Sequence, residues 1–328
     1  MPIRQLRPSR RGLLAAGLAA VPLQPARADT TWPDGRPTSL VIPYGPGGGT
    51  DILGRVVTQS LSEQHGAPFV MEHKPGAATT LAARQVARAR PDGHTLLLGS
   101  VGTFTLAPFA IRNLGYDPLA DFVHITMIAE TILVLVANPR WESLEHAIAG
   151  AKRRPGEMSF ATWGVGSTSH LMLVDLMTRA GIDLIHVPYN GTPPALTDAV
   201  AGRIDMMFSP LATAKPHIDA GRLRGLAVIR SSRVAALPDV KTIDEAGLPG
   251  LRSAAWLSLQ APAGTPQSVT SRVERTVGAA FRAPANRTLL DGLGMAEVDP
   301  GPEPLLARIR EELPRHKELM ARAGVQPE

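Results

Sequence analysis

The sequence predicts an α/β protein made of two lobes with a cleft between them. Along most of the 328 residues, short aliphatic runs alternate with segments whose apolar residues recur at helical spacing. Strands and helices in alternation form parallel sheets with helices packed on their faces. The alternation breaks once, where two extended apolar runs, 125–129 and 132–137, follow each other with no helix between them. A chain that passes from one lobe to another has this pattern.

The first lobe begins with a β-α-β-α-β series. Leu40-Val41-Ile42 is an unbroken aliphatic run ended by Pro43, as expected of a buried strand. A Pro-Asp-Gly turn at 91–93 leads into another such run. We expect strands at 40–42, 69–71 and 95–98 and helices at 52–61 and 81–87.

The alternation resumes after the double strand. Helices are expected at 143–153, 167–179, 193–201 and 211–220, and strands at 158–161, 184–187, 205–208 and 225–229. Because βαβ units continue here, the second lobe should also contain a parallel sheet.

The chain then returns to the first lobe through a Pro- and Gly-rich linker at 237–250. A strand at 256–261 and helices at 267–282, 285–293 and 303–312 follow. Pro314 should end the last helix, since proline has no backbone N–H to donate. We therefore expect one lobe from 29–126 plus 236–328 and the other from 127–235.

Residues 1–28 have the features of a secretory signal peptide. Four arginines precede an apolar stretch at 12–23, and Ala26-Arg27-Ala28 offers small residues for cleavage before Asp29. The mature protein would then be periplasmic. The run Ser9-Arg10-Arg11-Gly12-Leu13-Leu14 also fits a twin-arginine signal. The alternative is an N-terminal amphipathic or disordered arm.

Composition excludes several classes of function. The whole chain has 34 basic and 29 acidic residues, but residues 1–28 hold five arginines and no acid, so the mature chain has 29 of each and no net charge. Neutrality and the lack of a basic cluster argue against a nucleic-acid partner. The chain has no cysteine, and its nine histidines show no metal-ligand spacing. We expect no cofactor, no metal and a monomer.

A glycine-rich turn at 43–51 follows the first strand and opens the first helix. Glycines let a ligand approach the backbone, and a helix N-terminus attracts anions. Neither a Walker loop nor a dinucleotide fingerprint is present. The turn is therefore either an anion site or a tight turn in which Thr50 or Asp51 caps the helix. The candidate ligand-binding residues are Tyr44, Gly47, Gly48, Gly49, Thr50 and Asp51.

A second such turn follows the strand at 158–161. Its hydroxyl and N–H groups suit a carboxylate, and Trp163 would wall an apolar part of a ligand. Capping of the helix by Ser167 or Thr168 is the structural alternative. Ser167 with His170 also suggests a periplasmic hydrolase, although no Gly-x-Ser-x-Gly elbow is present. The candidates here are Trp163, Gly164, Gly166, Ser167, Thr168 and His170.

Three further segments place polar groups at strand ends. Asn190-Gly191 is a typical turn pair, and a purely structural turn explains that segment equally well. The candidates are Tyr189, Asn190 and Gly191, then Ser100, Gly102 and Thr103, and finally Ser209.

Taken in order, these turns resemble those of the extracytoplasmic receptors of tripartite tricarboxylate transporters, the Bug-type solute-binding proteins. The resemblance covers essentially the whole mature chain. It rests on Trp32-Pro33, IPYGPGGGTD at 42–51, EHKPGA at 72–77, ARPDGHTLL at 89–97, YDP at 116–118, GSTSHL at 166–171, HVPYNG at 186–191, DVKTIDEAGLPG at 239–250 and APAGTP at 261–266.

The resemblance implies two lobes of the type II periplasmic-binding fold and no catalytic residues. It also implies that the first two glycine-rich turns hold a ligand carboxylate, partly through water. A cognate integral membrane transporter would receive the ligand. A receptor that presents its ligand to a signalling partner is a further alternative.

The sequence departs from the family pattern at four places. The usual Pro-Gly-Ala-Gly-Gly is here Pro75-Gly76-Ala77-Ala78-Thr79. Asn190 stands where arginine is common, Ser209 where aspartate is frequent, and Trp163 is bulkier than expected. These departures favour a ligand with one carboxylate and an aromatic or apolar part over citrate.

Overall fold

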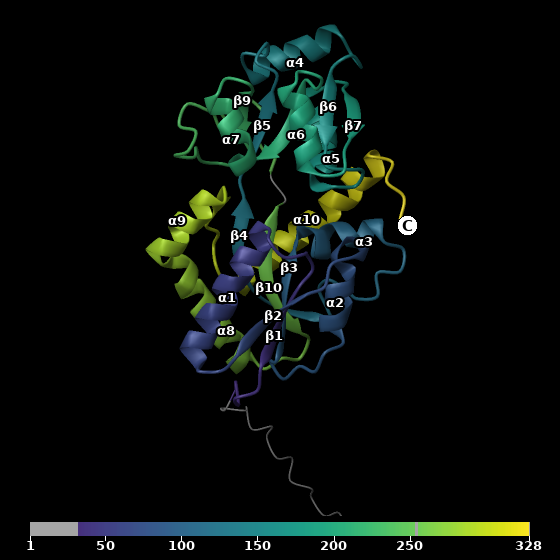
Figure 1. Cartoon of the computed structure of the whole chain (residues 1–328). Coiled ribbons are helices and arrows are strands. Elements are labelled where there is room, and N and C mark those ends of the chain that lie inside the picture. Colours follow the sequence, from purple (N-terminus) through teal and green to yellow (C-terminus); the bar gives the residue numbers. More distant parts are fainter. Residues whose placement is uncertain (1–31, 253–254, 328) are drawn as a thin grey trace, which may run out of the picture. The chain divides into compact units, whose positions relative to one another are not determined.

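The computed structural model describes residues 32–252 and 255–327, so the expected signal peptide lies outside the described residues. The first of two sheets contains six strands in the order β11-β4-β10-β3-β1-β2 (Figure 1). Strands β1, β2 and β3 are parallel, and β10 runs antiparallel to both β3 and β4. Their bounds are β1 Thr38–Ile42, β2 Phe69–His73, β3 Thr95–Ser100, β4 Phe122–Thr131, β10 Trp256–Pro262 and β11 Met295–Ala296.

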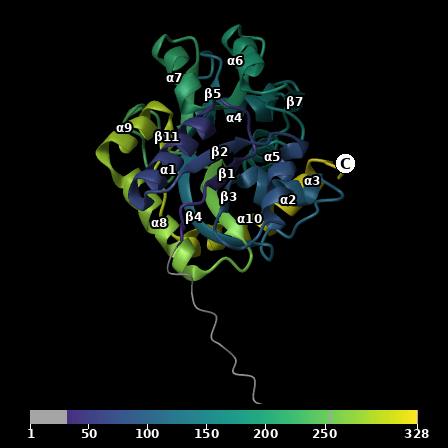
Figure 2. The same cartoon turned by 60° about the horizontal axis from the view of Figure 1, so that its bottom comes forward.

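Helices cover both faces of this sheet, with α1 and α8 on one side and α2 and α3 on the other (Figure 2). The packing of strand β1 on both of its faces explains why its residues 40–42 are all apolar. Leu40 and Ile42 pack in the core with α1 and α8, whereas Val41 packs on the opposite face with α2. The helical elements are α1 Gly49–His65, η1 Ala77–Thr79, α2 Thr80–Ala87, η2 Gly102–Leu106, α3 Ala107–Ala110, α8 Gln267–Arg282, α9 Pro284–Gly292 and α10 Pro302–Arg322.

The second sheet has five strands in the order β7-β6-β8-β5-β9. Alternate residues of β5 again serve two cores, since Leu133 and Leu135 face one cluster and Val134 and Val136 face the other. The elements are β5 Leu133–Ala137, α4 Leu144–Arg153, β6 Ser159–Thr162, α5 Thr168–Ala180, β7 Ile185–Pro188, α6 Thr192–Val200, β8 Met206–Pro210, α7 Leu211–Asp219 and β9 Arg224–Val228.

The chain crosses between the sheets at Ile132, between β4 and β5. The Ile132 N–H donates to the Gly294 carbonyl of the first lobe (2.9 Å), and the Leu211 N–H of the second lobe donates to the Ile132 carbonyl (2.8 Å). The expected boundary at 126/127 falls inside β4, which pairs along its length with β10. Sheet membership therefore places this crossing about five residues later than the sequence-based boundary, and the division into lobes stays a prediction.

The prediction that Pro314 ends the last helix is wrong, because α10 continues through it to Arg322. Proline removes one backbone hydrogen bond, but tertiary packing offsets that loss. Beyond Pro314, Leu319 and Met320 are buried with Leu171 and Val174 of α5 in the second lobe. The helix that begins on the first sheet thus ends against the second lobe. The π-helical turn η2, α3 and β11 were also missed by the sequence prediction.

Candidate functional site

A cavity of about 580 Å³ is lined by residues of both lobes. The first lobe contributes the η1 and η2 segments, the second contributes the glycine-rich turn before α5, and residues 324–327 after α10 complete the wall. Among the described residues that line it, none carries a formal charge. Its polar lining includes Thr79, Gly102, Gly164, Gly166 and Ser167, and its apolar lining includes Leu106, Ile111, Trp163 and Val165.

Another hollow of about 460 Å³ lies in the second lobe, between α4, α7 and the segment 236–241. Charged side chains of both signs line it, among them Glu142, Lys215 and Asp239. None of the polar turns singled out in the sequence reaches it, so the cavity lined by both lobes is the candidate site.

The second glycine-rich turn is a capped helix N-terminus whose backbone faces this cavity. Ser167 is the N-cap of α5, and its hydroxyl accepts the His170 N–H (3.3 Å). The same hydroxyl donates to the Gly164 carbonyl (2.7 Å). Gly164 and Gly166 have φ of +132° and +72°, values that disfavour side chains and explain the glycines. Capping and anion binding are compatible, because both satisfy N–H groups at the start of a helix.

His170 holds this turn through a hydrogen bond to Gly166 and does not activate Ser167. The Gly166 N–H donates to His170 Nδ1 (3.1 Å), and the His170 ring stacks on that of His186 at 4.0 Å. Burial, and secondarily His186, lower the pKa of His170 to about 4. The Ser167 hydroxyl donates its proton to the Gly164 carbonyl, and His170 Nδ1 accepts the Gly166 N–H. The described contacts therefore contain no serine–histidine pair of the hydrolase type.

The first glycine-rich turn is held by Asp51. The buried carboxylate accepts the Gly47 N–H (3.2 Å), pairs with Arg55 (3.2 Å) and lies 3.0 Å from His73 Nε2. The Gly47 N–H is the main cause of the lowered pKa of Asp51, and Arg55 adds to it. His73 Nδ1 also lies 3.0 Å from the Tyr44 carbonyl oxygen. Asp51 therefore positions the turn. A Cβ at Gly47 or Gly48 would meet no atom within 4 Å, and neither residue is among those that line the cavity.

Four hydroxyl groups connect this turn to the cavity. Tyr44 Oη lies 2.8 Å from Ser100 Oγ, Ser100 Oγ lies 3.3 Å from Thr103 Oγ1, and Thr103 Oγ1 donates to Thr79 Oγ1 at 3.0 Å. Burial raises the pKa of Tyr44, so its phenol keeps its proton. Of the four, Thr79 is the residue that lines the cavity. Sequence reasoning did not select Thr79 as a ligand-binding residue, although its departure from the family pattern was a usable signal.

The remaining predicted residues lie outside the cavity lining. The Tyr189 hydroxyl donates to Asp198 (2.8 Å), and Gly191 precedes α6. Ser209 is buried on β8, with its hydroxyl 3.1 Å from that of Thr213. Thr50, Thr168 and Asn190 are likewise absent from the lining. Within residues 32–252 and 255–327, no cluster of three metal-ligating side chains occurs, and no helix has the length and apolarity of a membrane span.

Comparison with known proteins shows the family. Residues 53–325 match the model of the tripartite tricarboxylate transporter family receptor. A protein from Pseudomonas sp. strain P51, described as a UPF0065 protein in the tcbD-tcbE intergenic region, is 35% identical over 316 residues and covers 95% of this chain and 94% of its own length. The chain belongs to the tripartite tricarboxylate transporter receptor family, whose members are solute-binding receptors and not enzymes.

Two solved structures from Rhodopseudomonas palustris show the same two-lobed periplasmic-binding fold. The protein Rpa4515, determined with adipate, is 32% identical with a TM-score of 0.73, over 90% of this chain and 100% of that one. MatC, determined with bound malate, is 32% identical with a TM-score of 0.69, over 86% and 98%. Relatives of this chain therefore bind small dicarboxylates.

Proposed function

We propose that this protein is a periplasmic receptor that captures a small carboxylate between its lobes and delivers it to a membrane transporter. The observation that carries the proposal is the cavity, which both lobes line with hydroxyl groups and a helix N-terminus and without charged side chains. Such neutral donors bind anions at helix N-termini. Membership of the family and the adipate and malate structures of relatives support the same ligand class.

The proposed direct contacts are Gly102, Trp163, Gly164, Gly166 and Ser167, which all line the cavity. Residues of the first turn and of the 189–191 turn would reach the ligand through water or after closure of the lobes. Asp51 would act by holding the first turn, because its carboxylate is engaged with Gly47, Arg55 and His73. Closure would bend the chain at Ile132, where the two sheets are joined.

The proposed ligand has one carboxylate and an apolar or aromatic part. Leu106, Ile111 and Trp163 give the cavity an apolar wall, and the Val165 side chain beside them is 65% exposed. A ligand that covers this surface gains hydrophobic stabilisation. Citrate would bring further carboxylates into a cavity that has no cationic lining residue, and desolvated charges without partners are costly.

Export is part of the proposal. The basic and apolar segments at 1–23 and the Ala-Arg-Ala site before Asp29 would direct the chain to the periplasm, by a twin-arginine signal if Arg10 and Arg11 act as one. Large and small integral membrane subunits would then be the partners.

Calorimetric titration of the mature protein tests the ligand class. Benzoate, as an aromatic monocarboxylate, should compete with adipate or malate and bind more tightly than citrate. Tighter binding of citrate than of any monocarboxylate would contradict the proposed ligand class and leave the receptor function standing.

A further inference from the structure

The hydroxyl groups of Tyr44, Ser100, Thr103 and Thr79 form a chain with one direction. Each hydroxyl has a single proton to donate. Thr103 gives its proton to Thr79, so in the contact between Ser100 and Thr103 the donor must be Ser100. By the same count, Tyr44 must donate to Ser100. The protons therefore all point from the first glycine-rich turn toward the cavity.

Thr79 ends this chain with a proton that has no acceptor among the described contacts. Its oxygen accepts from Thr103, and Thr79 is one of the residues that line the cavity. Hydrogen bonds in series polarise one another, which makes the last hydroxyl a stronger donor than an isolated one. A polarised donor therefore belongs to a residue of the cavity wall, whose described residues carry no charged side chain.

An unusual backbone conformation holds Thr79 at this position. Ala77, Ala78 and Thr79 have φ of +45°, +49° and +79°, three successive residues in the left-handed region. Residues with a Cβ rarely adopt this conformation, and a β-branched threonine does so least readily. Backbone strain of this kind persists where the surrounding structure requires it and gathers at ligand-binding sites. The Thr79 side chain is buried, at 9% exposure, so packing holds it in place.

We propose that Thr79 is a specificity-determining residue of this receptor, whose hydroxyl donates the terminal hydrogen bond of the chain to the ligand carboxylate. Tyr44, Ser100 and Thr103 are positioning residues that act through Thr79. The inference rests on the proposed function of the cavity as a carboxylate site.

The test is titration of the whole mature protein with whichever of benzoate, adipate and malate binds the wild type most tightly. Thr79→Val keeps the shape and removes the hydroxyl, and we expect it to weaken binding about 10- to 100-fold, the value of a hydrogen bond to a charged group. Thr79→Ser restores the donor and should bind within about threefold of the wild type. Tyr44→Phe should weaken binding only several-fold, because it removes polarisation and leaves the terminal donor.

Two further variants control for strain at position 79 and for the loss of a threonine hydroxyl elsewhere. Thr79→Gly removes the hydroxyl and suits the positive φ, so it should bind as weakly as Thr79→Val without loss of thermal stability. Thr288→Val makes the same change at an exposed position on α9, where the hydroxyl bonds the Pro284 carbonyl, and should leave affinity unchanged.

The outcomes separate the inference from the function. Binding by Thr79→Val or Thr79→Gly within twofold of the wild type overturns the role of Thr79 and leaves the receptor function intact. If the wild type binds no acid in the panel, the proposed function fails and the inference fails with it.

Discussion

His170 shows how a single residue of the site makes stability depend on pH. The ring lies behind the second glycine-rich turn, accepts the Gly166 N–H and stacks on His186. Burial first, and the neighbouring imidazole second, lower the pKa of His170 from 6.5 to about 4. The folded protein thus keeps this ring neutral at pH values where the unfolded chain protonates it.

The sign of the effect follows from that difference. Above pH 6.5 both states are neutral at His170, and stability is at its full value. As the pH falls from 6.5 to about 4, the unfolded state takes up a proton that the folded state does not, and stability decreases. His170→Gln keeps an acceptor for the Gly166 N–H but cannot be protonated in this pH range. We expect it to make the loss of unfolding free energy between pH 7 and pH 4.5 smaller by about 1–3 kcal/mol. Urea unfolding at pH 7 and pH 4.5 measures it.

The same substitution at His146, an exposed histidine on α4, is the matched control. Identical pH dependence in the wild type and in His170→Gln would show that this ring does not titrate as described.

At the residue scale, sequence patterns located part of the cavity lining. Glycines and a serine between a strand and a helix, as at 164–167, indicate a helix N-terminus from local information alone. Thr79, Leu106 and Ile111 lack such a local signal, because they reach the cavity through the packing of η1 on η2 and through the unpredicted α3 region. Two of the three links in the hydroxyl chain likewise join residues 56 and 24 positions apart, which no short motif reveals.

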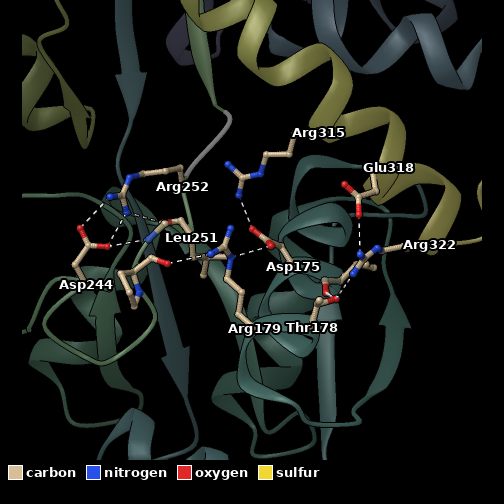
Figure 3. A network of polar contacts seen from close by, with 12 residues as sticks. Asp175, Thr178, Arg179, Asp244, Leu251, Arg252, Arg315, Glu318 and Arg322 are labelled. Atoms are coloured by element: carbon tan, nitrogen blue, oxygen red, sulfur yellow. Dashed lines mark hydrogen bonds and ion pairs between the residues drawn. The ribbon is translucent and has the colours of Figure 1, made fainter.

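At the scale of elements, α10 joins the lobes through a buried ion pair with α5. Asp175 of α5 pairs with Arg179 one turn away (2.8 Å) and with Arg315 of α10 (Figure 3). Asp175 is buried, while both arginines are partly exposed. Removing the carboxylate takes away the anion that both guanidinium groups share.

We expect Asp175→Ala to lower the free energy of unfolding by about 2–3 kcal/mol, less than for a fully buried pair because solvent screens the arginines. Glu318→Ala is the matched control, since Glu318 pairs with Arg322 on the exposed face of the same helix. It should cost less than about 1 kcal/mol. Equal losses in the two variants, measured by urea unfolding, would show that α10 is not anchored through Asp175.

Element types were predictable because aliphatic runs and helical spacing are strong local signals. Where the prediction of α10 failed at Pro314, contacts made by Leu319 and Met320 with α5 outweighed a local helix-breaking signal. The two-residue strand β11 is too short to leave a periodic pattern, and it exists by pairing with β4.

In the whole molecule, Gly294 of the first lobe lies close to Ala212 of the second lobe. Its φ is +64°, and a Cβ at this position would lie 2.7 Å from the Ala212 backbone nitrogen of the second lobe. Real Cβ atoms do not tolerate this distance, so a side chain would displace the backbone beside the Ile132 crossing.

Gly294→Ala should therefore lower the free energy of unfolding by about 1–3 kcal/mol, through strain and displaced packing. Gly292→Ala is the control two residues away, where a Cβ meets open space and φ lies outside the left-handed region. Denaturant unfolding of both variants measures these free energies. If Gly294→Ala leaves the free energy of unfolding unchanged, the stability of the protein does not depend on the close contact at Gly294.

If the cavity lined by both lobes recognises a carboxylate with neutral donors, the protein should distinguish an acid from its amide. The most direct test is a thermal-shift measurement on the protein from Asp29 onward, with each acid paired with its primary amide. We expect at least one small acid to raise the melting temperature by several degrees, because about 2.7 kcal/mol of stabilisation is gained at a hundred times Kd. Its amide should give a much smaller shift. Equal shifts for acid and amide, or no shift with any acid, would contradict the claim.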